Sequence, residues 1–464
     1  MRRVFIIVFC LGVLCMKAQN WDSIKGGKFS KAIETVLHDE VHDELLVSSK
    51  FIKDVGSKYI RGICRWNGQR WDSLSEGINT HDQLNPYPNG MALTCIEYQG
   101  KLLVGGMFQS VGGVQATSLA LWDGIRWDSL PKRAFRFNDS PVQVCGFVKK
   151  GSLLYIAGNF DTIAGQPAKG LATWDGVNFN PVSIPSTLGS QGVWAMALFQ
   201  NDLYITGGLF DLGGHYARDV IKISGSSWVS TTSSGLNGAF STIYDLVLYN
   251  NELYACGHFT KADGNSANHI MKWNGSQWED VGFGDQPTFV SINKMVVYKN
   301  KLWVFGGFDE AAGGFASNAA VYDGISWCGL SDTLDNKIGS AVVYHDTIYI
   351  GGGFWKANSD SIKFIAQLKN SSLYNTCVNV GIRGIDEKNQ IKIYPNPTAS
   401  QLNISSEQND LSSSTIEITN NIGQIVLQLT FSNSIDVSTL PEGCYFITVT
   451  TKDNRPYHSK FVKY

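Results

Sequence analysis

The 464-residue sequence has little charge. Charged residues make up 17% of it, the formal net charge is −2, and no run of Lys and Arg is longer than a pair. Proteins that bind nucleic acids need a basic surface to neutralise phosphates, so we expect no nucleic-acid partner. Apolar runs are also short. Beyond the N-terminal segment, none reaches the roughly 20 residues that a membrane-spanning helix requires.

Motifs that carry catalysis or bind metal are missing as well. The sequence has no nucleophile elbow, no paired-carboxylate motif and no clustered metal ligands, so we predict no catalytic residue, no cofactor and no metal site from motifs. Seven of the nine cysteines lie beyond residue 18, scattered and without a Cys-x-x-Cys pair. An odd, dispersed set is no disulfide framework, although one or two disulfides stay open.

Residues 1–18 predict a signal peptide. Arg2 and Arg3 provide a positive start, an apolar stretch runs from residue 4 to 16, and Ala18 offers a cleavage point. The apolar stretch is too short for a membrane anchor. We therefore expect an exported protein whose mature chain starts at residue 19.

Glycine and aromatic residues are abundant, and they form a repeat. A β-type run ending in Gly-Gly-x-Phe or a relative, a Gly-rich loop and Trp-Asp-Gly-x-x-Trp recur, in variants, seven times. The repeat is marked by Phe51, Phe108, Phe160, Phe210, Phe259, Phe308 and Phe354. A period of 46 to 57 residues with four short strands per unit predicts a propeller. The expected fold class is all-β, with a seven-bladed β-propeller over residues 19–378.

Two details of the repeat carry structural expectations. Asp-Gly predicts a two-residue type I′ turn, which would pair Trp122 with Ile125 and place both indoles of the hairpin on one face. The glycine pairs, such as Gly105-Gly106 and Gly306-Gly307, predict close approach of two backbones or positive φ. A phosphate-binding loop is the alternative, but the pairs recur in most units and no helix is expected after them.

One unit has a recognisable order of residues: Gly306-Gly307, then Val321-Tyr322-Asp323, then Trp327 and Leu330. This order resembles the kelch repeat family, although the turn between Asp and Trp is shorter. The resemblance implies a kelch-like propeller. Members of that family are mostly binding scaffolds, with a copper oxidase among the exceptions, so fold alone does not choose the function.

The N-terminus predicts how the ring closes. Trp21-Asp22-Ser23 repeats Trp71-Asp72-Ser73 without the three strands that should precede it. The last unit has a poor fourth strand, with Leu373-Tyr374 where most others have Trp. We expect the Trp21 strand to join or cover the last blade and so to close the ring.

The last 75 residues differ in composition. Trp disappears after Trp355, and short strand-like segments follow a polar stretch. We predict a linker at residues 379–389 and a small β-sandwich at 390–464. Pro395 and Pro397 prevent its first strand from lying centrally in a sheet.

The tail carries a set of motif residues: Tyr394, Pro395, Asn396, Pro397, Gly423, Gly443, Tyr445 and Lys463. With these residues it resembles the type A sorting domain of the type IX secretion system. The resemblance implies a secreted protein of the Bacteroidetes, at the outer cell surface or in the extracellular space. It also implies the secretion machinery at the outer membrane as a partner, and attachment to surface lipopolysaccharide as one fate.

One segment looks like a metal site but favours another structure. His38 and His42 have the spacing of a helical zinc-protease motif, but Asp39 stands where that motif has Glu. The segment aligns with a first strand and its turn, where residues four apart lie about 13 Å from each other. We therefore predict an acidic hairpin instead.

Two long loops are the candidate binding site, because loops on one propeller face carry function. They lie between Glu76 and Met91 and between Pro131 and Val142. Their candidate ligand-binding residues are His81, Asp82, Tyr87, Arg133, Arg136 and Asp139. The function expected is a non-catalytic binding or adhesion module for a glycan or protein. The alternative is a propeller enzyme: a glycosidase or lyase with two carboxylates about 5–9.5 Å apart, or a galactose-oxidase-like copper oxidase.

Overall fold

The computed structural model divides the chain into two compact units, residues 1–379 and 380–464. It describes residues 21–26, 29–49, 54–55, 58–59, 61–79, 90–130, 135–136, 142–182, 192–207, 210–211, 216–217, 220–225, 227–231, 236–237, 241–262, 267–284, 290–330, 333–357, 360–368, 391–405, 411, 414–420, 424–452 and 456–464. The predicted signal peptide and linker lie outside these residues. Within them, no helix is long and apolar enough to cross a membrane.

Small antiparallel sheets build the first unit. Seven sheets of four strands each lie within its described residues. The first strands are β2 (Thr35–Asp39), β9 (Met91–Tyr98), β16 (Gln143–Lys150), β22 (Val193–Phe199), β29 (Thr242–Tyr249), β34 (Ser291–Tyr298) and β40 (Ile338–Tyr344). The second strands are β3 (Glu44–Ser48), β10 (Lys101–Met107), β17 (Leu153–Asn159), β23 (Asp202–Gly207), β30 (Glu252–His258), β35 (Lys301–Gly307) and β41 (Thr347–Gly352).

The third and fourth strands of these sheets are shorter. The third strands are β6 (Ile63–Trp66), β13 (Leu119–Trp122), β20 (Leu171–Trp174), β26 (Val220–Ser224), β32 (Ile270–Trp273), β38 (Ala319–Tyr322) and β42 (Ile365–Leu368). The fourth strands are β7 (Trp71–Ser73), β14 (Trp127–Ser129), β21 (Phe179–Pro181), β27 (Ser227–Ser230), β33 (Trp278–Asp280), β39 (Trp327–Gly329) and β1 (Trp21–Asp22).

The loops of this unit contain short strands of two residues each. They are β4 (Asp54–Val55), β5 (Lys58–Tyr59), β8 (Ile78–Asn79), β11 (Ser110–Val111), β12 (Val114–Gln115), β15 (Phe135–Arg136), β18 (Thr162–Ile163), β19 (Gln166–Pro167), β24 (Phe210–Asp211), β25 (Tyr216–Ala217), β28 (Leu236–Asn237), β31 (Lys261–Ala262), β36 (Glu310–Ala311) and β37 (Gly314–Phe315).

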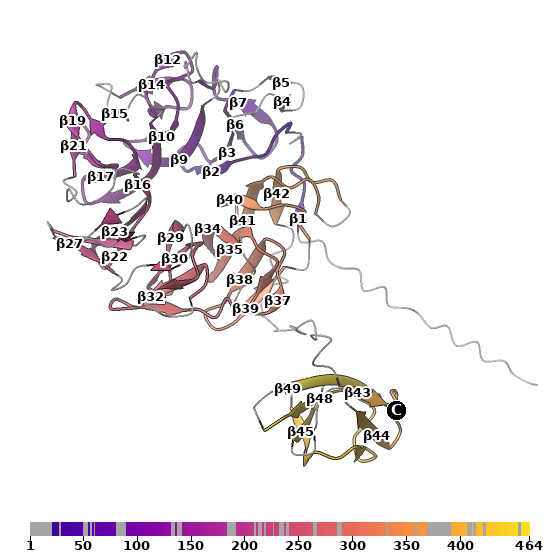
Figure 1. The fold of residues 1–464 in the computed structure, drawn as a ribbon. Helices are drawn as coiled ribbons and strands as arrows, with labels where there is room; N and C mark the ends of the chain where they lie inside the picture. Colours follow the sequence, from indigo (N-terminus) through magenta and orange to yellow (C-terminus); the bar gives the residue numbers. More distant parts are fainter. Residues whose placement is uncertain are drawn as a thin grey trace, which may run out of the picture. The chain divides into compact units, whose positions relative to one another are not determined.

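The sheets are arranged in a ring. Each first strand contacts the first strand of the next sheet, and β40 contacts β2, so the succession closes on itself. Figure 1 shows β2, β9, β16 and β34 around the centre and β7, β14 and β39 at the periphery. Tyrosines tie neighbouring sheets together: the hydroxyl groups of Tyr249, Tyr298 and Tyr344 donate to the carbonyl oxygens of Asn300, Asp346 and Asp43. The arrangement is that of a propeller.

The hairpins between third and fourth strands differ from the expected two-residue turn. Trp122 pairs directly with Trp127, and their rings lie 5.0 Å apart, so the predicted pairing with Ile125 is wrong. The cause is the Asp123 side chain, whose Oδ1 accepts hydrogen bonds from the N–H groups of Ile125 and Arg126. This Asx cap favours a four-residue loop over the tighter turn. Both indoles are nonetheless buried.

The repeated phenylalanines close the loops between second and third strands. The carbonyl of Phe308 accepts a hydrogen bond from the N–H of Asn318, and the N–H of Gly306 donates to the carbonyl of Asn318. Asn318 lies at φ +69°, in the left-handed region that Asn tolerates. His269 occupies the same position with Phe259 and Gly257, so the device recurs around the ring.

The Trp21 strand completes the last sheet, as predicted. β1 pairs with β42, Trp21 opposite Leu368 and Asp22 opposite Gln367 (Figure 1). The Trp21 side chain is fully buried and contacts the ring of Phe305 edge-on. The first described strand of the chain, β1, is therefore the fourth strand of the last sheet.

The second unit contains two small sheets over one apolar core. Its strands are β43 (Lys392–Tyr394), β44 (Gln401–Ser405) and β47 (Ser434–Asp436) in one sheet, and β46 (Ile425–Thr430), β45 (Thr415–Thr419), β48 (Gly443–Thr450) and β49 (Pro456–Lys463) in the other. Side chains from both sheets, among them Leu402, Ile418 and Ile447, are fully buried in the core. β43 is an edge strand and ends before Pro395, as the prolines predicted.

Candidate ligand-binding site

The first strands of the sheets, which we also call the inner strands of the ring, share one irregularity. Among the described strands, six of the seven first strands have a β-bulge, each five residues before the strand ends. The extra, unpaired residues are Leu93, Cys145, Trp194, Tyr244, Asn293 and Gly339. We call these six residues the inner collar. A bulge adds one unpaired residue and changes the direction of a side chain.

The repeated glycine explains the bulge. A Cβ on Gly257 would lie only 1.9 Å from the carbonyl oxygen of Thr242, and one on Gly306 only 2.0 Å from that of Ser291. In both sheets the residue with this carbonyl lies two positions before the bulged residue, which is Tyr244 in the first sheet and Asn293 in the second. Only glycine permits this approach. The close contact expected for the glycine pairs is thus confirmed, and it positions the collar.

Each collar residue is more open to solvent than the buried residue that precedes it. Ile243 is buried, whereas Tyr244 is 39% exposed. Ile292 is likewise fully buried, and Asn293 after it is half-buried. Each first strand pairs with its second strand along one edge and contacts the first strands of the neighbouring sheets. The first strands lie around the centre of the ring (Figure 1), so the collar residues belong to its innermost strands.

Three consecutive inner strands carry partly exposed aromatic and apolar side chains. Trp194 and Tyr244 come from adjacent sheets, and Leu248 and Val297 on β29 and β34 are about 40% exposed further along the same inner strands. Burial raises the pKa of the Tyr244 phenol, so its hydroxyl stays protonated and can donate a hydrogen bond. Burial also raises the pKa of the Cys145 thiol to about 11, which keeps this sulfur un-ionised at neutral pH.

Asn293 contributes an oriented amide to the collar. Its Nδ2 donates to the carbonyl oxygen of Ile338 at 2.8 Å, and its Oδ1 accepts from Ser291 Oγ at 3.0 Å. These two bonds fix which end of the amide is which. A primary amide has two N–H groups and two acceptor positions, so one donor and one acceptor position remain.

Two ion pairs join neighbouring inner strands. Lys294 Nζ lies 3.0 Å from an Asp245 carboxylate oxygen, and the same carboxylate accepts the N–H of Met295. Burial alone would lower the pKa of Lys294, but the Asp245 carboxylate outweighs it and the pKa is raised. Glu97 on β9 pairs with Lys149 on β16, whose hydrogen bond lowers the pKa of that carboxylate. These two ion pairs neutralise four of the charged groups on the described inner strands.

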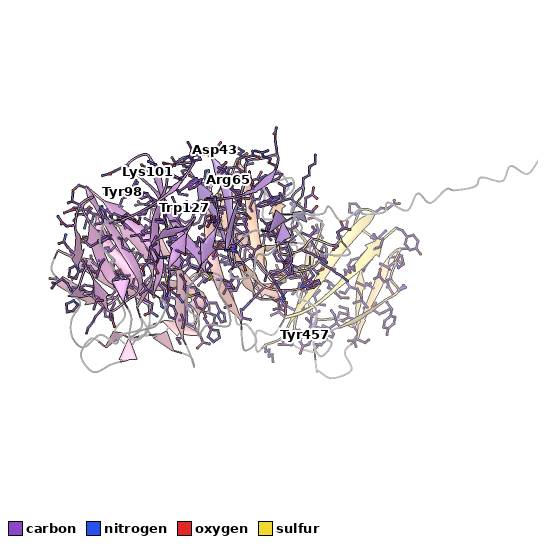
Figure 2. The ribbon with its side chains drawn as sticks, turned by 90° about the horizontal axis from the view of Figure 1, so that it is seen from above. Asp43, Arg65, Tyr98, Lys101, Trp127 and Tyr457 are labelled. Carbon is purple, nitrogen blue, oxygen red and sulfur yellow. The ribbon has the colours of Figure 1, made fainter. Side chains whose placement is uncertain are left out.

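The His38–Glu44 segment is the hairpin that its alignment predicted. His38 lies on β2, and the turn to β3 spans residues 40–43. His42 Nδ1 is 2.7 Å from Asp39 Oδ2, and Asp43 Oδ2 is 2.7 Å from His345 Nε2 of the last sheet. Figure 2 shows Asp43 and Lys101 at the same edge of the ring, the face of the turns between first and second strands. Within the described residues, no group of three or more His, Cys, Asp or Glu could hold a metal ion.

The loop residues predicted to bind ligand are not brought together by the described structure. His81, Asp82, Tyr87, Arg133 and Asp139 lie outside the described residues. Arg136 lies on β15, opposite Thr162 of β18, and its side chain is also outside the description. These six residues stay a prediction.

Sequence reasoning missed the inner collar. One signal was available in the chain's own repeats: five residues before the end of each first strand, the residue type changes from Leu to Cys, Trp, Tyr, Asn and Gly. The preceding residue stays small or aliphatic throughout. A position that varies inside an otherwise regular repeat marks the part of the unit that packing does not dictate.

The residues of the sorting motif are mostly structural in the second unit. Asn396 Nδ2 donates to the carbonyl of Lys460, and its Oδ1 accepts the N–H of Val462, so the amide extends the edge of β49. Tyr445 is buried, stacks on Phe461 and donates to the carbonyl of Pro441. Tyr394 is 55% exposed, and the peptide bonds before Pro395 and Pro397 are cis. Gly443 pairs with Lys463 across β48 and β49, and Gly423 lies outside the described residues.

The ring unit is thus an all-β, propeller-like protein of small four-stranded sheets. Its tail is more specific: residues 392–464 match the family Secretion system C-terminal sorting domain. This match supports the predicted type IX sorting domain. It implies export to the cell surface or extracellular space and interaction with the secretion machinery.

Solved structures resemble the chain in fold alone. The extracellular domain of BT3049 from B. thetaiotaomicron, described as a hybrid two component system, matches with 11% identity and a TM-score of 0.50, over 96% of this chain and 57% of that one. This chain therefore spans little more than half of that structure. The structure of U3-55K matches with 12% identity and a TM-score of 0.45, over 76% and 98% of the two chains. Comparison with curated proteins finds no match.

Proposed function

We propose that this is a secreted, non-catalytic binding protein of the Bacteroidetes, exported by the type IX secretion system through residues 390–464. Its signal peptide is residues 1–18, and its binding module is a seven-bladed, kelch-like propeller over residues 19–378, joined by the linker 379–389. The match of residues 392–464 to the sorting-domain family is the observation that carries the export. Attachment to lipopolysaccharide and release into the medium are its two possible fates.

A disulfide supports an extracytoplasmic location. Cys328 is disulfide-bonded, whereas Cys64, Cys95, Cys145 and Cys256 are free thiols. Disulfides form and persist in oxidising compartments and are rare in the cytosol. The bond therefore agrees with a chain that leaves the cytoplasm.

Binding of a glycan or protein is favoured for the ring because the inner collar combines two partly exposed aromatics with an oriented amide, and ion pairs lie on the same strands. Ligand sites commonly consist of apolar walls with a few placed polar groups. The alternative is an enzyme on extracellular polysaccharide. The carboxylates on the described inner strands, Asp39, Glu97 and Asp245, each contact a histidine or lysine. Hydrolysis assays on any bound glycan test that alternative.

Export is tested by deleting the tail. The full chain and a chain ending at residue 378 are produced in a Bacteroidetes host that has the type IX system and in a host that lacks it. We expect the full chain at the surface or in the medium only in the first host, and the truncated chain in the periplasm of both. Equal export of both chains would refute the proposal.

A further inference from the structure

We propose that the inner collar binds a neutral glycan, with sugar rings stacked on Trp194 and Tyr244 and sugar hydroxyls bound by Asn293. The inference rests on the proposed binding function and names its site and ligand class. It begins with the bulges: β22, β29 and β34 are consecutive inner strands, and each presents its extra residue at the same level of the ring.

The aromatic part of the site suits a flat, partly apolar ligand. Tyr244 is held by a bulge between the buried Ile243 and Asp245, so its ring is exposed from a rigid strand. Trp194 has the same position one sheet away and is half-buried. Aromatic side chains offer large contact area with little conformational entropy to lose. The C–H face of a pyranose is a matching surface.

The amide suits hydroxyl groups. Asn293 already donates to Ile338 and accepts from Ser291, which leaves one N–H and one acceptor position in a fixed orientation. A pair of neighbouring sugar hydroxyls can accept from that N–H and donate to that oxygen at once, because each hydroxyl is both donor and acceptor.

The ion pairs of the described inner strands favour an uncharged ligand. The inner strands pair Lys294 with Asp245 and Lys149 with Glu97. No uncompensated cation from these pairs is left to bind a carboxylate or sulfate, and anionic polysaccharides depend on such cations. An uncharged glycan is the class that needs none.

Binding of the mature chain, residues 19–464, is measured by tryptophan fluorescence and calorimetry. The neutral probes are the hexaoses of cellulose, xylan, mannan and starch. The anionic probes are polygalacturonate and alginate, and reduced casein is the protein probe. We expect at least one neutral hexaose to bind, and Tyr244→Ala and Asn293→Ala each to weaken it at least tenfold.

The matched control is Trp355→Ala, which removes an aromatic that is 53% exposed away from the collar, and it should bind as wild type. Thermal melts of all variants verify folding. Unchanged affinity in both collar variants would overturn the site but leave the proposed binding function standing. Binding only to an anionic probe or to casein would overturn the ligand class. Binding to no probe would overturn the inference. It would not affect the secretion proposal, which the export assay tests separately.

Discussion

His269 shows how one buried side chain can make this ring sensitive to acid. Its side chain is buried, with 3% exposed, and its backbone has φ +62°. It occupies the same loop position as Asn318 in the next sheet. Burial, and then the charge of His258, lower the pKa of its imidazole to about 4, although a hydrogen bond to the Gly257 backbone opposes the shift. An unfolded histidine has a pKa near 6.5. Between these two values the unfolded chain binds a proton that the folded chain does not.

We therefore predict that the ring loses stability as the pH falls from about 6.5 to 4, and that His269→Asn removes part of this loss. A depressed histidine pKa stabilises the fold fully only above the unfolded pKa, and about 1–3 kcal/mol is at stake. Asn tolerates positive φ and stands at the equivalent site, Asn318, so the variant should fold. Urea unfolding at pH 7 and pH 4.5 measures the effect. The same pH dependence in both proteins would contradict the assignment.

At the level of the element, the bulged hairpin of β34 and β35 depends on one glycine of its pair. A Cβ at Gly306 would collide with the Ser291 carbonyl, whereas one at Gly307 meets only Lys337 Cβ at 3.4 Å. We predict that Gly306→Ala destabilises the ring by about 1–3 kcal/mol through overpacking, and that Gly307→Ala is nearly neutral. Chemical denaturation compares the two variants. Equal effects would mean that the bulge does not need the close approach.

The sequence predicts hairpins well and their registers poorly. The repeats gave the strands and the contact at the glycine pairs because these follow from hydrophobic pattern and backbone sterics. The Trp122–Ile125 pairing was wrong because the Asp123 side chain stabilises a longer loop, a competition between two turns that differ little in energy. The bulge at Tyr244 was missed because one unpaired residue leaves the alternation on either side intact.

For the whole molecule, closure joins the two ends of the ring unit by two kinds of contact. The Tyr344 hydroxyl donates to the Asp43 carbonyl at 3.0 Å, as its counterparts do between other sheets. The Trp21 strand completes the sheet of β40, β41 and β42. We call the boundary between the last sheet, which contains β40, and the first sheet, which contains β2, the seam. A ring closed only by side-chain contacts could open there. Because β1 pairs with β42, opening the seam also requires breaking the backbone hydrogen bonds between these two strands. That closure was predictable, since the missing fourth strand and the stray Trp-Asp-Ser segment are both visible in the sequence.

Deleting residues 19–30 should therefore lower the melting temperature markedly, and Trp21→Ala alone should cost about 3–5 kcal/mol, because it removes a fully buried indole beside Phe305. Trp355→Ala is the matched control. It removes the same side chain from an exposed position near the same seam and should cost less than about 1 kcal/mol. Scanning calorimetry of the mature chain compares them. If the deletion melts with the wild type, the seam is held by the Tyr344 contact and its neighbours, and the strand only covers it.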